Sequence, residues 1–372
     1  MKKTTKYLFQ LMGALVGFGL GLFFALMINR VPGLSPVAEL GLYIAAVVLI
    51  YPLFLAGTVL HEAGHLIFGL LTGWRFVSFR VGSVIWLRGA DGRIRRGRFA
   101  LAGTAGQCLL APPPWREAGF PYRLYNMGGV IMNLLTAVVC GLLTAIFWHR
   151  PLAALVLAEA ALLSLLMALL NGIPLRGMAV NNDGSNQVFM RQSANARRAL
   201  WLQMSVAAAE AQGKHLREMP DKWFKPFPAE AMDNPLIASI AVFAAEQKLN
   251  AFDLPGAEAA IRALLAREKG VAPLYKALLT VDGAFCELAG GHPGDLCESL
   301  NAPAYRQMLK SMRRYPAILR TRYAEALLKN NDDALAQAYL EAFEEVAEDY
   351  PYPQDIEFER EAMALAREAK NA

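Results

Sequence analysis

Long apolar runs occupy the first half of the chain and are missing from the second half. Four of them extend over about residues 7–28, 37–71, 125–148 and 152–170. A helix of about 20 apolar residues is long enough to cross roughly 30 Å of hydrocarbon. We therefore expect four membrane-spanning helices. The second run exceeds one straight crossing, so its last turns should lie near an interface.

The first run and the short connection between the last two runs both bear on the membrane topology. The first follows Lys2, Lys3 and Lys6 and resembles a signal peptide. Its length, and the lack of a small-residue cleavage site before Arg30, favour a retained helix. Only residues 149–151 separate the third and fourth runs, which indicates a tight helical hairpin.

The connection between the second and third runs is rich in arginine. Its arginines are Arg75, Arg80, Arg88, Arg93, Arg95, Arg96, Arg98, Arg116 and Arg123. Short positive loops stay in the cytoplasm. We therefore place the amino terminus, this loop and the carboxy-terminal half in the cytoplasm and the turn at His149 outside. The expected location is a bacterial cytoplasmic membrane, which the protein crosses several times.

Within this connection, residues 76–87 and 93–101 alternate between apolar and polar side chains. The turn Ala90-Asp91-Gly92 lies between them, and the pattern predicts a β-hairpin. Unpaired strand edges are too costly in hydrocarbon. The hairpin should therefore lie at the cytoplasmic face or pack inside the protein.

The second half has a helical pattern with ordinary charge density. Amphipathic stretches cover residues 236–246, 256–267, 317–329 and 334–346. Helical pairs beginning at Asn234-Pro235 and Tyr315-Pro316 have the outline of tetratricopeptide hairpins. The fold class we expect is an all-α membrane bundle with a small β-hairpin, followed by a soluble α-helical, solenoid-like domain. The boundary divides the chain into residues 1–190 and 191–372.

Two details of the second half leave alternatives open. A solenoid-like array exposes a concave surface that can dock a partner or a substrate tail, but the helices can also be a simple cap. Trp201, Trp223 and Phe224 can anchor this domain at the membrane surface or belong to its core.

The composition agrees with a membrane protein. Hydrophobic residues make up 55% of the chain and charged residues 19%, which is fewer charges than an ordinary soluble domain has. The net charge of +5 does not indicate nucleic-acid binding, because no basic stripe with interleaved aromatic residues is present. The four cysteines lack short paired spacings, so we expect free thiols.

The second run contains, in its last third, the segment HEAGH, which carries the candidate chemistry. His61 and His65 are four residues apart, so a helix presents both imidazoles on one face, where they suit one Zn²⁺ ion. Glu62 lies near the same face and can reach a water at the metal without binding the ion. Burying three ionisable side chains in an apolar helix is costly unless they are paired or ligated. This cost favours a catalytic metal site over coincidence.

A catalytic zinc site needs a third protein ligand. Glu159 lies in the fourth run but only about two turns from its outer end, which should put it out of reach of His61. Asp183 follows the cytoplasmic end of that run and has the right depth. Its setting, Asn182-Asp183-Gly184, is also typical of an ordinary turn. The pattern alone leaves this ligand open.

Residues 40–186 resemble the site-2 protease family of intramembrane zinc metalloproteases. The resemblance consists of HEAGH, of the motif GGVIMN ending at Asn133, of Asn171-Gly172-Ile173-Pro174, and of Asp183-Gly184. It implies that Asp183 is the third ligand. It also implies that Asn133 and Asn171 hold the substrate backbone or brace the site; the alternative is interhelical hydrogen bonding. Val130 departs from the proline that many members have, and the segment between Pro174 and Asp183 is longer than in the compact form of the motif.

The combined hypothesis is a zinc-dependent intramembrane endopeptidase that cuts a membrane-spanning or membrane-inserted protein or peptide near the cytoplasmic face. Its expected partners are that substrate, the lipid bilayer and a protein bound to the helical domain. The first alternative is an inactive membrane scaffold, which the intact Glu62 disfavours. The second is a transporter, which four helices without an internal repeat disfavour.

Overall fold

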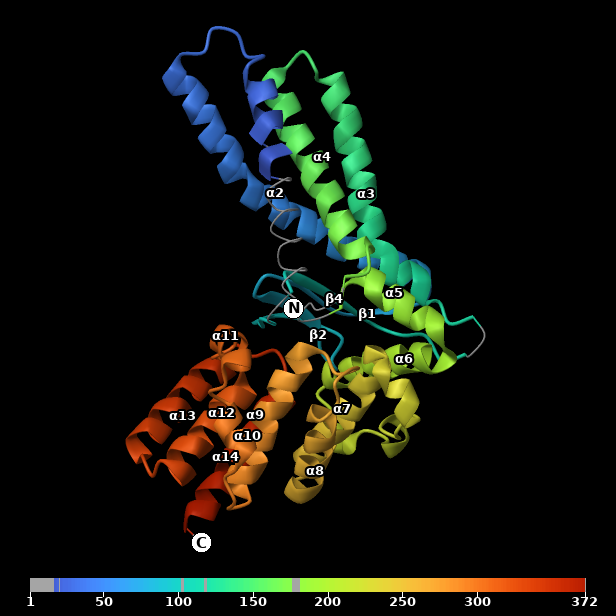
Figure 1. Ribbon diagram of the computed structural model, residues 1–372. Helices are drawn as coiled ribbons and strands as arrows, with labels where there is room; N and C mark the ends of the chain where they lie inside the picture. Colours follow the sequence, from blue (N-terminus) through green and yellow to red (C-terminus); the bar gives the residue numbers. More distant parts are fainter. Residues whose placement is uncertain (1–16, 20, 102–103, 117–118, 176–180, 372) are drawn as a thin grey trace.

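Three long apolar helices form one end of the molecule. The structure is a computed structural model and describes residues 17–19, 21–101, 104–116, 119–175 and 181–371. Helices α2 (Pro36–Leu71), α3 (Tyr122–Ile146) and α4 (Pro151–Gly172) are long and apolar enough to cross a membrane. They stand together on one side of a small sheet (Figure 1). The second, third and fourth predicted spans are therefore present as helices of suitable length and composition.

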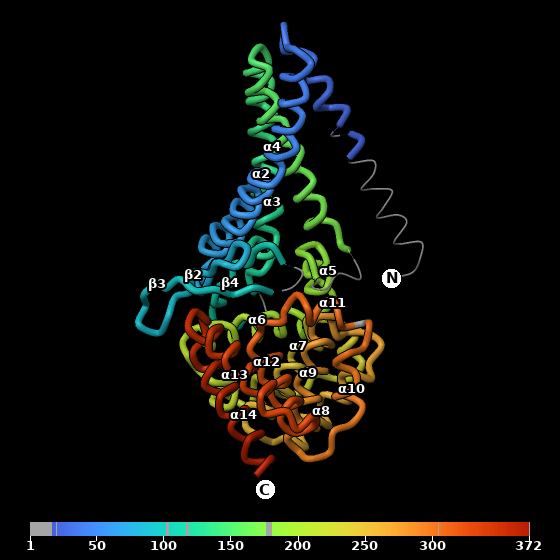
Figure 2. The backbone as a smooth tube through the Cα atoms, turned by 90° about the vertical axis from the view of Figure 1, so that its left-hand side faces the viewer, coloured from blue at the N-terminus to red at the C-terminus, as the bar shows by residue number. Residues whose placement is uncertain are grey.

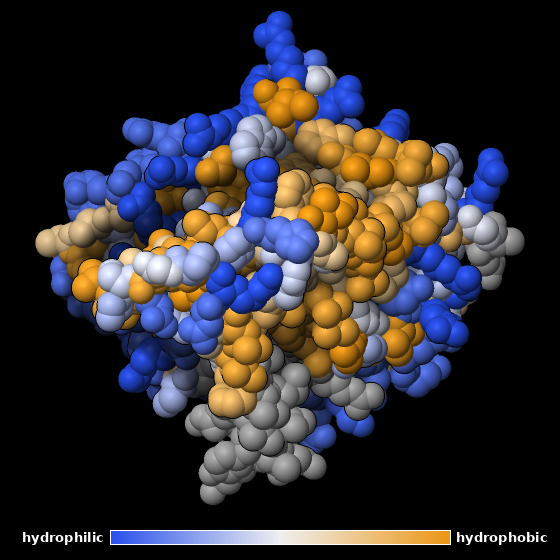
Figure 3. All heavy atoms as spheres, turned by 90° about the horizontal axis from the view of Figure 1, so that it is seen from above, coloured by the Kyte–Doolittle hydropathy of each residue, from blue (hydrophilic) through white to orange (hydrophobic). Residues whose placement is uncertain are grey.

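The first predicted span lies partly outside the described residues, which begin at residue 17. The described part contains a shorter apolar helix, Gly17–Ile28. Within the described chain, the helices that qualify as spans therefore number three, against the four expected. Figure 3 looks down on this end and shows hydrophobic residues over the apolar helices with hydrophilic residues around them.

Helix α2 begins where its sequence predicts a start and extends beyond one bilayer. Ser35 caps it by accepting a hydrogen bond from the Ala38 N–H, and Pro36 occupies the first turn, where its missing donor costs nothing. Its 36 residues span about 54 Å at 1.5 Å per residue, against about 30 Å of hydrocarbon. The HEAGH segment lies in the last third of this helix.

The arginine-rich connection forms four antiparallel strands where a hairpin was expected. They are β1 (Arg75–Val81), β2 (Val84–Arg88), β3 (Ile94–Arg98) and β4 (Gly106–Ala111), in the order β3-β2-β1-β4. The first predicted strand is wrong as one element. It folds back at Gly82, which has a φ of +59°, so that Ser78 pairs with Leu87. The turn around Asp91 is as predicted.

The carboxy-terminal part is helical throughout its regular elements. Its α-helices are α5 (Asp183–Gln192), α6 (Ala194–Glu210), α7 (Pro235–Asn250), α8 (Leu254–Leu265), α9 (Pro273–Ala289), α10 (Asp295–Ser299), α11 (Pro303–Ser311), α12 (Pro316–Ala324), α13 (Asp333–Ala347) and α14 (Pro353–Asn371). Short helical turns occupy η1 (Leu216–Glu218), η2 (Asp221–Trp223), η3 (Ala229–Asp233) and η4 (Glu325–Lys329). The four amphipathic stretches predicted from the sequence correspond to α7, α8, α12 with η4, and α13. We call α6 to α14 the helical body.

The sheet lies between the membrane helices and the helical body (Figure 2). One apolar cluster joins Trp74, Cys108 and Leu110 to residues of α6 and α7. Trp201 belongs to this contact, since its indole N–H donates to the Pro113 carbonyl at 2.8 Å. Phe224 is also buried. These aromatic residues therefore pack in the core, which was one of the two alternatives. All four cysteines are free, as predicted.

The opposite edge of the sheet contacts the loop between α13 and α14. The Arg98 N–H donates to the Asp349 carbonyl at 3.0 Å. Phe99 lies edge-on against Tyr350 and Tyr352, with ring centroids 6.0 and 5.8 Å away. The helical body therefore contacts the sheet near β4 and near β3, and a cavity lies between the sheet and the body.

Candidate metal centre

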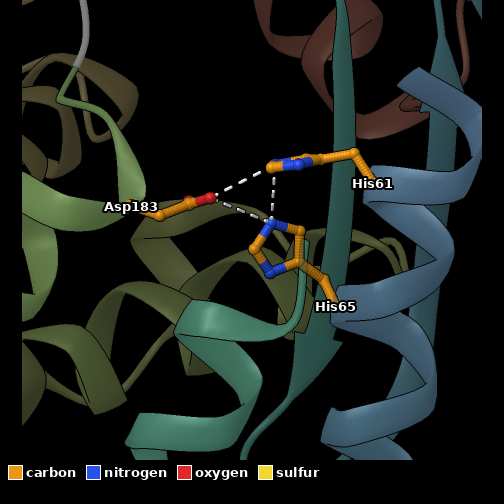
Figure 4. A group of neighbouring side chains, drawn as sticks. All are labelled: His61, His65 and Asp183. Carbon is orange, nitrogen blue, oxygen red and sulfur yellow. Dashed lines mark hydrogen bonds and ion pairs between the residues drawn. The ribbon is translucent and has the colours of Figure 1, made fainter. Parts of the chain in front are cut away.

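The structure brings His61, His65 and Asp183 together. The two histidines lie one turn apart on α2, and Asp183 is the first residue of α5 (Figure 4). Asn182 positions the aspartate. Its amide group donates to the carbonyls of Leu170 and Ile173, and its Oδ1 accepts from the Ser185 N–H. This cap fixes the start of α5 against the end of α4.

The three side chains have the separations that a tetrahedral ion requires. The Nε2 atoms of His61 and His65 are 3.2 Å apart, and Asp183 Oδ2 lies 3.2 and 3.4 Å from them. A tetrahedron with bonds of about 2.0 Å to zinc has edges of about 3.3 Å. Within the described residues, this is the group of three or more His, Cys, Asp or Glu side chains found at metal-binding distances.

Hydrogen bonds at the far side of each ring leave both Nε2 atoms available. His65 Nδ1 donates to the Tyr125 carbonyl at 2.8 Å, which leaves Nε2 as the nitrogen that faces the centre. His61 Nδ1 lies 3.1 Å from the amide group of Asn133, whose Oδ1 is buried and has no partner in the described part of the chain. When that amide turns to accept from Nδ1–H, both the Oδ1 and the imidazole are satisfied. Such outer contacts orient metal ligands.

The charge of Asp183 agrees with a ligand role. Burial raises the pKa of its carboxyl group, but the facing His65 and His61 lower it more, to about 2. The carboxylate is therefore ionised at neutral pH. Asn126 also holds this residue in place, because its amide group donates to the Asp183 carbonyl at 2.8 Å.

Glu62 lies beside this group with its carboxylate free. The residue is 7% exposed, and among the described residues its side chain has no hydrogen-bond or ion-pair partner. Gly106, at the start of β4, lies against it: a Cβ there would stand 2.5 Å from Glu62 Oε1. Arg80 fixes the segment from Thr104 to Gly106 by donating hydrogen bonds to the Gly106 carbonyl and to Thr104 Oγ1. The sheet therefore limits where the Glu62 carboxylate can point.

Glycines permit the close approach of the helices around the centre. A Cβ on Gly64 would lie 2.3 Å from the Gly128 carbonyl oxygen, and one on Gly128 would lie 2.5 Å from that of Gly64. The main chains of α2 and α3 therefore touch directly beside His61 and His65. A Cβ on Gly184 would likewise lie 2.2 Å from the Gly172 carbonyl oxygen, so α5 packs closely on the end of α4.

We expect Gly129→Ala to remove most of the bound zinc. A Cβ at this position would lie 2.4 Å from His61 Nε2, so the ring has to turn away from the centre. Gly141→Ala is the matched control, since it lies on the same helix with nothing within 4 Å. Alanine is about 1 kcal/mol better than glycine inside a helix, so neither change weakens α3 itself. Equal zinc content in the two purified variants would contradict the position of the His61 ring.

The other residues singled out from the sequence have different surroundings. Asn171 donates to the Met167 carbonyl of its own helix at 3.0 Å and faces the cavity beside the centre. Glu159 is fully buried in α4, its carboxyl oxygens have no partner among the described residues, and it is not part of the metal-binding group. Asn126 was not singled out. Its spacing of seven residues from Asn133, two helical turns, places both on one face of α3 and was the available signal.

The centre opens into a cavity of about 720 Å³. The cavity is lined by α2, by the start of β4 and α5, and by residues of the helical body as far as Asp355. A bound chain can therefore reach from Glu62 into the helical body. Comparisons with protein-family models, with curated proteins and with solved structures found no match to this chain.

Proposed function

We propose that this protein is an intramembrane zinc endopeptidase that resembles the site-2 protease family. The observation that carries the proposal is the placement of three ligand atoms 3.2–3.4 Å apart, next to a Glu62 that faces the cavity and has no partner among the described side chains. Two imidazoles and one carboxylate are a donor set that zinc accepts in catalytic sites. The third ligand comes from a segment far along the chain, which a chance HEAGH on an apolar helix would not supply.

The chemistry assigned to the chain is hydrolysis of a peptide bond. A zinc ion held by His61, His65 and Asp183 would act as a Lewis acid on the scissile carbonyl and on the attacking water. Glu62 accepts a proton from that water as its oxygen bonds to the carbonyl carbon. It then delivers the proton to the leaving amine as the C–N bond breaks. The water is thereby divided between the new carboxyl and amino ends.

Strand β4 is suited to hold the substrate beside this centre. It is the terminal strand of the sheet, and its residues 106–109 line the cavity. An extended peptide can pair with such an edge through its main chain. A transmembrane helix has its backbone groups already bonded, so the substrate has to unwind before it can pair and be cut.

The membrane would be a bacterial cytoplasmic membrane, with the body in the cytoplasm as a solenoid-like array that recruits a partner or a substrate. The alternative function is an inactive scaffold with the same ligands. Zinc measurement on the purified protein, together with cleavage of a membrane-spanning peptide before and after chelation, separates the two. About one zinc per chain without any hydrolysis would favour the scaffold.

We expect a cysteine placed at Arg95 to resist an impermeant thiol reagent in intact cells and one placed at His149 to react. Both positions are exposed, and Arg95 lies on the arginine-rich sheet, which positive charge should keep inside. Permeabilised cells provide the control, in which both should react. Labelling of the Arg95 position in intact cells would invert the proposed topology.

A further inference from the structure

One face of the β2–β3 hairpin is open to the surroundings. Residues that stand directly opposite each other in an antiparallel pair point to the same side of the sheet. Six side chains of the two strands share this face: Val84, Trp86, Arg88, Ile94, Arg96 and Arg98. All of them except Val84 are exposed, Trp86 at 39% and Ile94 at 60%. We call these six residues the basic face.

The basic face points to the same side of the sheet as helix α2. The register joins Trp86 to Phe79 on β1, and Phe79 to Cys108 on β4. Leu110, two residues further along β4, points to the same side. It lies against α2, because a Cβ on Gly69 would stand 2.1 Å from the Leu110 Cδ1. Helix α2 therefore packs on β1 and β4, while β2 and β3 extend beyond it (Figure 2).

The opposite face of the hairpin packs on the helical body. Leu87 belongs to an apolar cluster with Ala208 and Ala211 of the body. Gly97 lies against the loop between α13 and α14, since a Cβ there would stand 3.0 Å from the Asp349 carbonyl oxygen. The sheet lies between the membrane helices and the body. The basic face is therefore turned away from the body and toward the membrane side.

The charge of the basic face is not balanced within the described part of the chain. Its three arginines make no ion pair there, whereas Arg95, on the opposite face of β3, pairs with Asp91 at 2.9 Å. None of the six residues of the face is acidic. The tryptophan and the isoleucine add apolar surface among the arginines. The face therefore combines positive charge with exposed apolar side chains.

An anionic membrane surface is the partner that this combination fits. Each arginine or lysine near such a surface strengthens binding about fivefold. A guanidinium group can bind a phosphate through two parallel hydrogen bonds. Tryptophan is enriched at the level of the lipid headgroups, where its ring is buried and its N–H stays in the polar layer. The face also lies beside helices that are long and apolar enough to cross a membrane. This position favours lipid over an acidic protein.

We propose that the basic face of the β2–β3 hairpin binds anionic lipid headgroups of the membrane around α2, α3 and α4. Its arginines contact the lipid phosphates, and Trp86 and Ile94 enter the headgroup layer. Strands β2 and β3 belong to the same sheet as β4, so this contact also fixes the depth of the strand beside Glu62. The inference depends on a membrane around these helices and not on zinc binding or peptide cleavage.

The test places a fluorescent dye on the basic face and measures its contact with lipid. Ile94→Cys carries the dye in full-length protein with Cys140→Ala, because Cys140 is the native cysteine that is not buried. The protein is reconstituted in nanodiscs of phosphatidylcholine, or of equal parts phosphatidylcholine and phosphatidylglycerol, each with a quencher on some headgroups. We expect quenching to be about fivefold or more stronger in the anionic nanodiscs, and the difference to shrink at high salt.

Neighbouring arginines on opposite faces of β3 provide matched variants. Arg96→Gln removes a charge from the basic face and should lower the ratio of anionic to neutral quenching by about half or more. Arg95→Gln makes the same change on the other face and should keep the ratio. The triple variant Arg88→Gln, Arg96→Gln, Arg98→Gln should bring the ratio close to one. Melting temperatures equal to that of the parent protein show that each variant is folded.

A ratio near one in the parent protein, or a ratio that the triple variant retains, would overturn the inference. Equal losses in the Arg95→Gln and Arg96→Gln proteins would do the same, because they would reflect net charge and not this face. Strong quenching in both kinds of nanodisc would mean apolar contact without recognition of lipid charge. That result would also reject the proposal and assign the arginines to an acidic protein partner.

Discussion

Glu62→Gln should abolish peptide cleavage while the protein keeps its zinc. The change removes the proposed proton acceptor without removing a proposed ligand, and general acid–base groups contribute about 10²- to 10⁴-fold to rate. Glutamine has nearly the same shape, so the contact with Gly106 is kept. We therefore expect kcat to fall by about 10³-fold with zinc content and melting temperature close to those of the wild type.

A matched control lies on the same helix. Glu39→Gln makes the same chemical change in the first turn of α2, far along the helix from HEAGH, and should leave activity unchanged. The measurements are zinc content and cleavage of a membrane-spanning peptide. A Glu62→Gln protein that cuts at the rate of Glu39→Gln would show that Glu62 is not the proton acceptor.

Asp183→Asn should weaken zinc binding and lower activity together. The neutral amide is a poorer ligand and removes the one negative charge among the three side chains that face each other. Mutation of a residue that only hydrogen-bonds to a metal ligand typically lowers metal affinity by about 10–100-fold. We therefore expect the loss of a ligand's charge to lower zinc affinity by at least as much. Competition with a zinc chelator measures the change.

Glu159→Gln provides the contrast for this prediction. Glu159 is a buried residue of α4 that does not belong to the metal-binding group. The zinc affinity of the Glu159→Gln protein should therefore equal that of the wild type. The reverse order, with Glu159→Gln losing zinc and Asp183→Asn keeping it, would transfer the ligand role to Glu159.

The parts of the site that depend on local spacing could be predicted from the sequence. His61 and His65 share a face of α2 because the four-residue spacing nearly equals a helical turn. The position of Asp183 could not be obtained in this way, since its local sequence is that of any turn. The family resemblance pointed to it. The contact itself depends on the Asn182 cap and on the packing of α5 against α4.

The features that the sequence did not predict all depend on tertiary contacts. Strand β4 is short and its six residues carry no clear alternation, so only pairing with β1 identifies it. Gly106 gains its role at Glu62 through that strand.

The direct contact between Gly64 and Gly128 has a consequence for how this protein can evolve. Neither position can become larger unless α2 and α3 move apart, and neither can become smaller to compensate for the other. The spacing of the two helices is thus set by main-chain atoms, and substitutions elsewhere on the lipid-facing surfaces can accumulate without disturbing it. Because the two ligand-bearing turns of α2 lie beside this contact, we expect both glycines to be kept for as long as the proposed metal site is kept.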